Sequence, residues 1–284
     1  MIKLALGTAQ FGLPYGINNQ YGIPKDDELY KIFLLAKQFG ISVLDSAQAY
    51  GNAEERIGEL SNNRFQIITK FRNLESPFSL HKELKESLTK LRSASVYGYM
   101  AHDSNLLIDN PTWWEVLKEA KLKGLVKKIG YSLYSVNQLE SLLLKQMIPD
   151  IIQFPFNVLD RRFEPYLPEL FSMGVEIHTR SVYLQGLLHM DANKLSSNLK
   201  KLKPYLMQIK EIASKDGFTA SQLCLGFALQ NPFINKVVIG IDNSKQLIEN
   251  ITFYQNSKLP GVVVNELNSI DVKEKKLLNP ANWN

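Results

Sequence analysis

The sequence predicts one α/β domain folded as a (β/α)₈ barrel, also called a TIM barrel. Short apolar runs rich in valine and isoleucine alternate with longer amphipathic stretches, which is typical of parallel strands that are each followed by a helix. The 284 residues accommodate the roughly 250 that such a barrel needs. A doubly wound open sheet is the second interpretation. It is disfavoured because Gly7-Thr8-Ala9-Gln10-Phe11-Gly12 is not a G-x-G-x-x-G turn, and no P-loop occurs elsewhere.

Each expected strand is a short apolar run without the alternation of a half-exposed sheet, which indicates burial on both faces. The expected strands are Leu4–Leu6, Val43–Ser46, Gln66–Thr69, Tyr97–Ala101, Lys128–Tyr131, Ile151–Phe154, Val175–His178 and Val237–Gly240.

The stretches between these runs carry apolar residues at helical spacing. The expected helices are Asp26–Phe39, one that opens at Asn52, Leu80–Leu91, Thr112–Lys123, Val136–Leu144, Pro165–Ser172, Tyr205–Ser214, Ala220–Leu229 and Lys245–Tyr254. We expect Asn52 and Glu55 to form a capping box, and Thr219 and Ser244 to be N-caps. No linker divides the chain, so residues 1–284 are expected to form one domain, with residues 256–284 as a C-terminal tail.

Composition excludes several classes of protein. Hydrophobic residues make up 45% and charged residues 21% of the chain, which is ordinary for a folded domain. No apolar stretch approaches the roughly 18 residues of a membrane span, and no signal peptide is recognisable. Cys224 is the one cysteine, so no intramolecular disulfide or cysteine-based zinc site is possible. We therefore expect a cytoplasmic protein with no membrane partner and no metal site.

The net charge of +5 leaves nucleic acid, a membrane surface or a small anion as possible partners. The lysines are spread along the chain and are not interleaved with aromatic residues, as base-stacking surfaces require. The sequence therefore predicts a small-molecule partner and no nucleic acid. No heptad or exposed apolar helix stands out, so a monomer is the default expectation.

Polar side chains collect where the strands of a barrel end, which is where barrel enzymes carry their chemistry. Asp45, Lys70 and His102 follow or close three successive strands, and Tyr50 lies a few residues beyond Asp45. Each alone is explained as well by capping, an ion pair or packing. Together they suit proton delivery to a carbonyl oxygen, because an ammonium held by a carboxylate stabilises a nearby phenolate. The hydride would come from a cofactor, usually a nicotinamide, since no side chain supplies it.

At these positions the sequence resembles the aldo-keto reductase family. Asp45-Ser46-Ala47-Gln48-Ala49-Tyr50-Gly51 resembles the family's D-T/S-A-x-x-Y-G signature, and Ile68-Thr69-Lys70 and Met100-Ala101-His102 resemble its lysine and histidine motifs. The resemblance implies an NAD(P)H-dependent oxidoreductase that reduces an aldehyde or ketone to an alcohol. In that reaction Tyr50 is the general acid, Asp45 and Lys70 tune it, and His102 orients the carbonyl.

The resemblance also implies a nicotinamide dinucleotide across the barrel mouth. The residues that it assigns to cofactor binding are Gly7, Thr8, Ala9, Asp45, Ser132, Gln153, Arg180, Ser181, Leu184, Gly186, Asn243, Ser244, Lys245, Glu249 and Asn250. The sequence favours NADP(H) over NAD(H), because Ser and Lys at a helix N-terminus can bind a phosphate. Asp242 argues the other way, since a carboxylate suits a free ribose 2′-hydroxyl.

The substrate is the least specified part of the prediction. The residues expected to contact it are Tyr15, Gln48, Tyr50 and His102. The polar loop after the first strand, Gln48 and Arg180 favour a sugar-like or sugar-derived carbonyl compound. Two other functions are considered. One is an aldolase that uses Lys70 as a Schiff-base nucleophile, which Asp45 disfavours because that lysine must be neutral. The other is a nicotinamide-nucleotide-binding barrel without catalysis.

Overall fold

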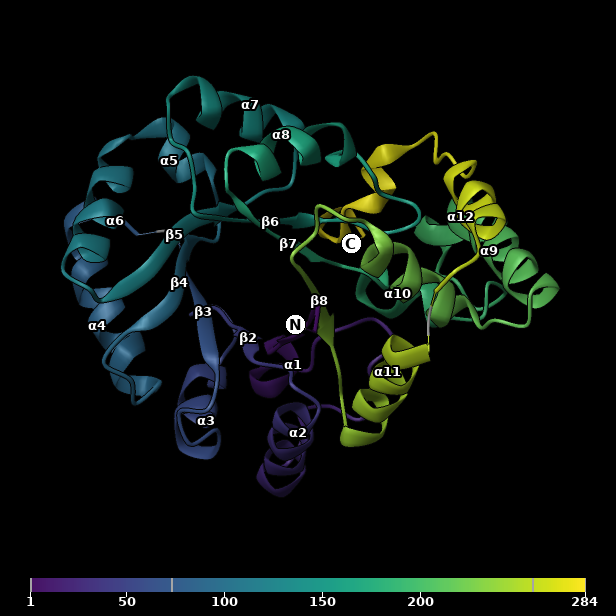
Figure 1. Ribbon diagram of the computed structural model, residues 1–284, viewed down its shortest axis with the longest axis horizontal. Coiled ribbons are helices and arrows are strands. Elements are labelled where there is room, and N and C mark those ends of the chain that lie inside the picture. The colour runs from purple at the N-terminus through teal and green to yellow at the C-terminus, as the bar shows by residue number, and fades with distance from the viewer. Residues whose placement is uncertain (1, 73, 257, 284) are drawn as a thin grey trace.

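A closed barrel of parallel strands forms the centre of the protein in this computed structural model, which describes residues 2–72, 74–256 and 258–283 (Figure 1). Each strand pairs with the next along the chain, and the first also pairs with the last. The sheet therefore has no open edge, which excludes the doubly wound alternative. The strands are β1 (Leu4–Gly7), β2 (Val43–Asp45), β3 (Gln66–Phe71), β4 (Val96–Ala101), β5 (Val126–Ser132), β6 (Ile151–Pro155), β7 (Glu176–Arg180) and β8 (Lys236–Gly240).

Helices surround the barrel, and α9 and α12 lie together at one side (Figure 1). The helices are α1 (Ala9–Gly12), α2 (Asp26–Gln38), α3 (Ala53–Leu60), α4 (Leu80–Lys90), α5 (Asn105–Asp109), α6 (Thr112–Leu122), α7 (Val136–Leu144), α8 (Leu167–Ser172), α9 (Lys203–Lys215), α10 (Ala220–Gln230), α11 (Ser244–Asn256) and α12 (Gly261–Asn268). Short 3₁₀ segments occur at η1 (Pro77–Ser79), η2 (Glu164–Tyr166), η3 (Leu184–His189), η4 (Ser197–Leu202), η5 (Lys275–Leu278) and η6 (Pro280–Asn282).

One of the three predicted helix caps is confirmed. Thr219 and Gln222 form a reciprocal capping box at α10. The box predicted at α3 is wrong, because the side chain of Asn52 makes no cap hydrogen bond. At α11 the helix begins at Ser244, and the preceding Asn243 accepts the Gln246 N–H through Oδ1 at 2.9 Å. Ser244 is therefore not the N-cap that the sequence predicts.

Two strands, β3 and β7, continue two residues beyond their predicted C-terminal ends. Strand β3 continues through Lys70 and Phe71 because both residues stay in register with β4. Strand β7 runs to Arg180, which pairs with Pro155 of β6. In each of these two strands the apolar sequence pattern is interrupted by a polar side chain, Lys70 in β3 and Arg180 in β7. The backbone pairing with the neighbouring strand nevertheless includes that residue. Lys70 and Arg180 are consequently held on rigid strands and not on loops.

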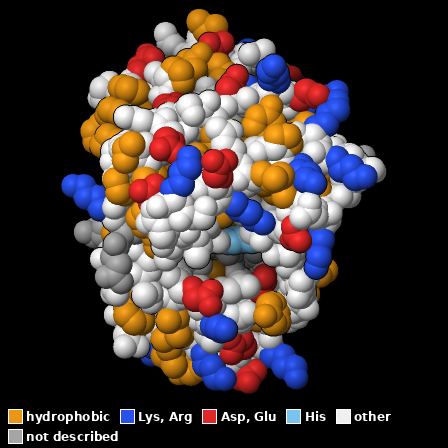
Figure 2. Space-filling view, turned by 90° about the vertical axis from the view of Figure 1, so that its right-hand side faces the viewer, with side chains coloured by type: hydrophobic (Ala, Val, Ile, Leu, Met, Phe, Trp, Pro, Cys, Tyr) orange, Lys and Arg blue, Asp and Glu red, His pale blue; other side chains and the backbone are white. Residues whose placement is uncertain are grey.

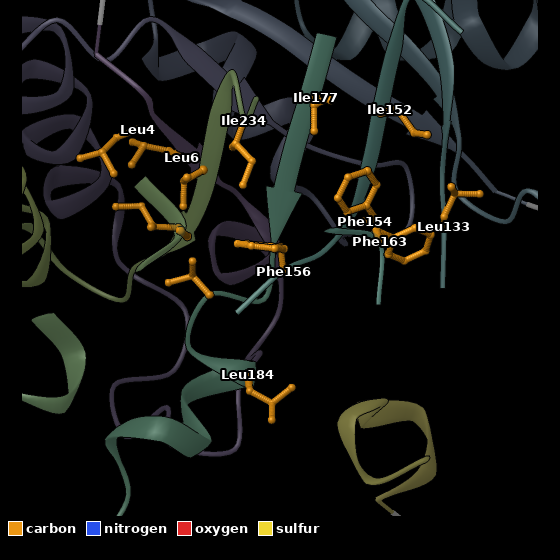
Figure 3. Packing of buried hydrophobic residues seen from close by; sticks show 14 of the residues in the cluster. Leu4, Leu6, Leu133, Ile152, Phe154, Phe156, Phe163, Ile177, Leu184 and Ile234 are labelled. Carbon is orange, nitrogen blue, oxygen red and sulfur yellow. The ribbon is translucent and has the colours of Figure 1, made fainter. Parts of the chain in front are cut away.

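The core lies between the barrel and its helices. Phe154 at the end of β6 stacks on Phe163 with ring centroids 4.5 Å apart (Figure 3). Phe156 stacks on Phe227 of α10 at 5.7 Å. Such apolar burial, at about 25 cal/mol per Å², is the main stabilising contribution of the fold. Cys224 is buried here, and burial raises the pKa of its thiol to about 12, as expected for a packing residue.

Within the described ranges, no helix combines the length and the hydropathy needed to cross a bilayer. The same residues contain no group of three or more His, Cys, Asp or Glu side chains placed to hold a metal ion.

Candidate active site

A cavity of about 1160 Å³ opens at the C-terminal end of the barrel. Its wall includes the last residues of several strands, Gly7, Asp45, Arg180 and Gly240 among them. Figure 2 shows one face of the molecule, which is hollowed near its centre and has a histidine side chain at the hollow. The volume exceeds the range of roughly 300–1,000 Å³ usual for small-ligand pockets, so it has room for more than one small molecule.

A buried ion pair lies beneath this cavity. The Lys70 Nζ is 2.6 Å from Oδ1 of Asp45 and donates to the Ser46 carbonyl at 2.9 Å. The second carboxylate oxygen, Oδ2, accepts from Nε2 of Gln153 at 2.8 Å. Burial lowers the pKa of Lys70, and the Asp45 carboxylate opposes that shift. Lys70 is fully buried and is not part of the cavity wall.

Tyr50 lies between this ion pair and His102. The rings of Tyr50 and His102 meet edge to face, with centroids 5.8 Å apart, and the Lys70 Nζ is 5.6 Å from the Tyr50 ring centroid. Both rings line the cavity. The sequence therefore predicts correctly that Asp45, Tyr50, Lys70 and His102 come together at the barrel mouth.

The protonation states differ in part from the prediction. Burial and the Asp45 carboxylate raise the pKa of Tyr50, while the Arg180 guanidinium lowers it. The expected lowering by Lys70 is therefore not the dominant effect, and the phenol is protonated at neutral pH. Burial, Lys70 and Arg180 lower the pKa of His102 to about 4, so its imidazole is neutral.

Glycine allows the backbone to place Tyr50. A Cβ atom on Gly12 of α1 would lie 2.0 Å from the Tyr50 carbonyl oxygen. Gly51 has φ +57°, and a Cβ there would lie 2.4 Å from the Gly12 carbonyl oxygen. Only glycine permits this mutual approach. Helix α1, which follows β1, thus sets the position of the loop that carries Tyr50.

Arg180 reaches across the mouth from β7. Its guanidinium carbon lies 4.3 Å from the ring centroid of Tyr134, and Nη2 donates to the Leu133 carbonyl at 3.1 Å. Nη1 donates to Oγ of Ser181 at 3.3 Å. The guanidinium therefore stacks on an aromatic ring of the protein itself. Tyr134 was not predicted to line the site, although the strand-end rule applies to it because it closely follows β5.

The loop after β1 contacts the segment after β7 across the cavity. The Gln185 Nε2 donates to the Tyr15 hydroxyl at 2.8 Å, and the Ile17 N–H donates to the Gln185 carbonyl at 3.2 Å. Burial raises the pKa of Tyr15 to about 12. Tyr15 and Asn18 line the cavity, so this loop forms part of its cover.

The segment after β7 is bent by residues in the left-handed region. Leu184 and Gln185 have φ of 48° and 54°, and Gly186 has φ of 89°. The N–H groups of Leu184 and Gly186 donate to the carbonyls of Ser181 and Tyr183. These two N–H groups are thus already bonded within the segment. Gly186 lines the cavity, whereas Leu184, which was also predicted to bind the cofactor, is buried outside the cavity wall.

Helix α11 forms the far wall of the cavity. Asp242, Gln246, Glu249 and Asn250 line it, while Asn243, Ser244 and Lys245 do not. The Asn250 side chain is bonded at both ends: it accepts from the Tyr183 hydroxyl and donates to the Gln246 carbonyl. A ligand can therefore contact only the part of the Asn250 side chain that faces the cavity.

Two further predicted residues lie away from the cavity. Gln48 donates to the Ser87 hydroxyl at 2.9 Å and to the Glu83 carbonyl at 3.1 Å, so its side chain is tied to α4. Its predicted contact with a substrate is wrong, because it is not part of the wall. Ser132 ends β5, is buried and is also absent from the wall.

Several residues of the wall were not predicted. Among them are Gln10, Tyr134, Tyr183, His189, Phe218, Ser221, Gln222 and the tail residues Asn279, Pro280 and Ala281. Most belong to the long connection between β7 and β8 or to the tail, where strand periodicity gives no positional signal.

Comparison with known proteins gives one consistent result. A family model described as "Aldo/keto reductase family" matches residues 3–272. The chain is 27% identical over 243 residues to the uncharacterized oxidoreductase YqkF of Bacillus subtilis, covering 76% of this chain and 78% of that protein.

Solved structures share the fold. The holo form of the aldo-keto reductase AKR11C1 from Bacillus halodurans superposes with a TM-score of 0.76 at 20% identity, covering 96% of this chain and 94% of the other. The glycerol dehydrogenase AKR11B4 from Gluconobacter oxydans gives 0.73 at 19% identity, covering 94% and 90%.

Proposed function

Because the chain belongs to the aldo/keto reductase family, which implies NAD(P)H-dependent carbonyl reduction, we propose that this cavity reduces an aldehyde or ketone with Tyr50 as the proton donor. The observation that carries the proposal is the cluster of a protonated phenol, a neutral imidazole and a buried ammonium–carboxylate pair at one mouth. Separate structural roles do not account for all four groups converging on one cavity.

The wall suits an extended nicotinamide dinucleotide. The cavity wall includes Asp45 and Gln153 as well as Asp242 and Glu249, and its volume of about 1160 Å³ leaves space for a small substrate as well. Gln153 would hold the carboxamide: its Nε2 is bonded to Asp45, so Oε1 is the atom left to accept a hydrogen bond. When bound, the reduced nicotinamide supplies a hydride to the carbonyl carbon.

The protein's residues handle the proton. The Tyr50 hydroxyl donates its proton to the carbonyl oxygen as negative charge develops there, which leaves a phenolate. The Lys70 ammonium and the Arg180 guanidinium stabilise that phenolate, and solvent returns the proton. His102, neutral above pH 4 or so, donates a hydrogen bond to the same oxygen and fixes its direction.

The alternative functions have less support. An aldolase needs a neutral and accessible lysine, whereas Lys70 is fully buried and 2.6 Å from a carboxylate oxygen. A barrel that only binds nucleotide needs no phenol and imidazole in edge-to-face contact at the mouth.

The substrate end favours a polar carbonyl compound such as a sugar or sugar derivative. Tyr15, Asn18, Tyr134 and Arg180 present hydroxyl, amide and guanidinium groups to the cavity. Gln48 is bonded to Ser87 of α4 and is not part of this wall. A panel that pairs keto-sugars with apolar aldehydes of similar size tests it, and a large preference for the apolar aldehydes would refute it.

The assignment of Tyr50 is tested with Tyr50→Phe. We expect carbonyl reduction to fall by about 100-fold or more, the scale of a general acid, while the dissociation constant for the reduced dinucleotide stays within about twofold. Tyr21→Phe is the matched control, because Tyr21 is exposed and outside the cavity wall. Undiminished turnover in Tyr50→Phe would show that another group donates the proton.

A further inference from the structure

The far end of the cavity carries negative charge and no basic side chain. Asp242 and Glu249 line it. Among the described residues, the only lysine or arginine in the whole cavity wall is Arg180, whose guanidinium is already held by the Tyr134 ring and the Leu133 carbonyl. The 2′-phosphate of NADP(H) carries almost two negative charges at neutral pH, so this end offers it no cation.

The N-terminus of α11 is also occupied. A helix N-terminus binds phosphate through its free N–H groups. Here the Ser244 N–H donates to Oε1 of Glu28 at 2.7 Å, and the Gln246 N–H donates to Oδ1 of Asn243 at 2.9 Å. The carboxylate of Glu28, from α2, therefore stands where a phosphate would have to approach. Lys245 is exposed and lies outside the wall.

Asp242 is held in a fixed orientation beside this terminus. Its Oδ2 accepts from Nε2 of Gln246 at 3.1 Å, and its own N–H donates to Oε1 of the same side chain at 2.8 Å. Among the described residues, no hydrogen bond involves Oδ1. A carboxylate oxygen placed in this way accepts a hydrogen bond from a ribose 2′-hydroxyl and repels a phosphate on the same carbon.

A second helix N-terminus in the wall gives no alternative phosphate site. Thr219 and Gln222 begin α10, and their capping box uses the Gln222 N–H and the Thr219 N–H. The nearby His189 accepts or donates at Nδ1 with Ser221 at 2.6 Å, and burial lowers its pKa. A neutral histidine adds no positive charge here.

We infer that this protein selects NAD(H) over NADP(H), with Asp242 as the specificity-determining residue and Glu28 as a second carboxylate that keeps the α11 N-terminus closed to phosphate. The inference rests on the proposed function, because it concerns the same dinucleotide. The sequence alone favours NADP(H) on the basis of Asn243, Ser244 and Lys245, and this inference is the opposite.

Calorimetric titration of the full chain with NADH and with NADPH tests the inference without relying on turnover. We expect the wild type to bind NADH at least about tenfold more tightly, since a charged hydrogen bond is gained and a repulsion is avoided. Asp242→Ser should bring the two dissociation constants together, mainly by strengthening NADPH binding. Asp242→Asn keeps the shape of the side chain and removes its charge. It should bring the NADH and NADPH dissociation constants closer together, but by less than Asp242→Ser does.

Three more variants separate local effects from overall charge. Glu28→Gln should strengthen NADPH binding several-fold without changing NADH binding, because it removes a negative charge beside the helix terminus. Asp27 is an exposed neighbour of Glu28 on the same helix. Asp27→Asn removes an equal charge and should change neither the NADH nor the NADPH dissociation constant. Lys245→Gln should leave the ratio of the NADH and NADPH dissociation constants unchanged.

The outcomes distinguish this inference from the proposed function. Tighter binding of NADPH by the wild type, or a loss of NADPH affinity in Lys245→Gln, would overturn the NAD(H) preference and leave the reductase proposal intact. Binding of neither dinucleotide would overturn the proposed function itself.

Discussion

The Lys70 Nζ and Oδ1 of Asp45 lie 2.6 Å apart in the centre of the barrel, where both side chains are almost completely shielded from solvent. Two adjoining strands supply the residues: Asp45 ends β2, and Lys70 lies in β3. A third strand contributes Gln153, which binds the other carboxylate oxygen. The pair therefore joins three strands of the barrel at the base of the cavity, and both its stability and the proposed chemistry depend on its being complete.

Removing one charge of this pair should destabilise the fold. Asp45→Asn leaves a buried ammonium without its carboxylate, which typically lowers the free energy of unfolding by about 3–5 kcal/mol. Urea denaturation monitored by circular dichroism measures the change. Glu59→Gln, which removes an exposed ion pair with Arg92, should change it by less than about 1 kcal/mol.

The double variant separates the two roles of the pair. Asp45→Asn combined with Lys70→Met removes both buried charges, so much of the lost stability should return. Carbonyl reduction should stay low, since the phenolate on Tyr50 then lacks its ammonium. A double variant as active as the wild type would show that the pair has only a structural role.

His102 should remain neutral through the physiological pH range. Its pKa of about 4 results from burial, Lys70 and Arg180, so no acidic loss of kcat/KM should come from this group until the pH approaches that value. Arg180→Gln removes one of the two nearby cations and should raise the pKa of His102. NMR titration of the histidine ring measures both values, with His102→Gln identifying the signal. An unchanged pKa in Arg180→Gln would contradict this electrostatic coupling.

Glu176 should make the protein sensitive to acid at the opposite end of the barrel. Burial alone would raise its pKa, but hydrogen bonds from His178, Lys128 and Tyr97 lower it from 4.5 to about 2. A carboxyl group with a depressed folded-state pKa contributes stability above its unfolded pKa and loses it as the pH falls through the folded one. The free energy of unfolding should therefore fall by about 3 kcal/mol between pH 4.5 and 2 from this group.

Glu176→Gln tests that assignment. The variant should be less stable than the wild type at pH 7, and the difference should shrink as the pH falls towards 2. Denaturation curves at several pH values measure it. Parallel curves for the variant and the wild type would show that Glu176 does not carry the acid sensitivity.

The barrel and the clustering of the four candidate residues were predictable because both follow from local patterns. Strand and helix periods are repeated along the chain, and Asp45, Lys70 and His102 occupy strand ends that a barrel must bring together. Other features depend on contacts between distant segments. Glu28 and Ser244 are 216 positions apart, and no pattern in either segment indicates their hydrogen bond. The orientation of Gln48 likewise depends on packing against α4, which spacing within its own loop does not specify.

Gly12 should prove necessary for placing Tyr50, although it lies outside the cavity wall. In Gly12→Ala the new Cβ would lie 2.0 Å from the Tyr50 carbonyl oxygen and 2.7 Å from the Ala53 nitrogen, so α1 or the Tyr50 loop must move. We expect stability to fall by about 1–3 kcal/mol and kcat/KM to fall about tenfold or more, since displacement of a catalytic group by about 1 Å is costly. Gly261→Ala is the matched control, because a Cβ there meets no atom within 4 Å. Dinucleotide affinity should change little in both variants, because the proposed role of Tyr50 is proton transfer to the substrate. Full activity in Gly12→Ala would mean that the loop reaches the same geometry without this close approach.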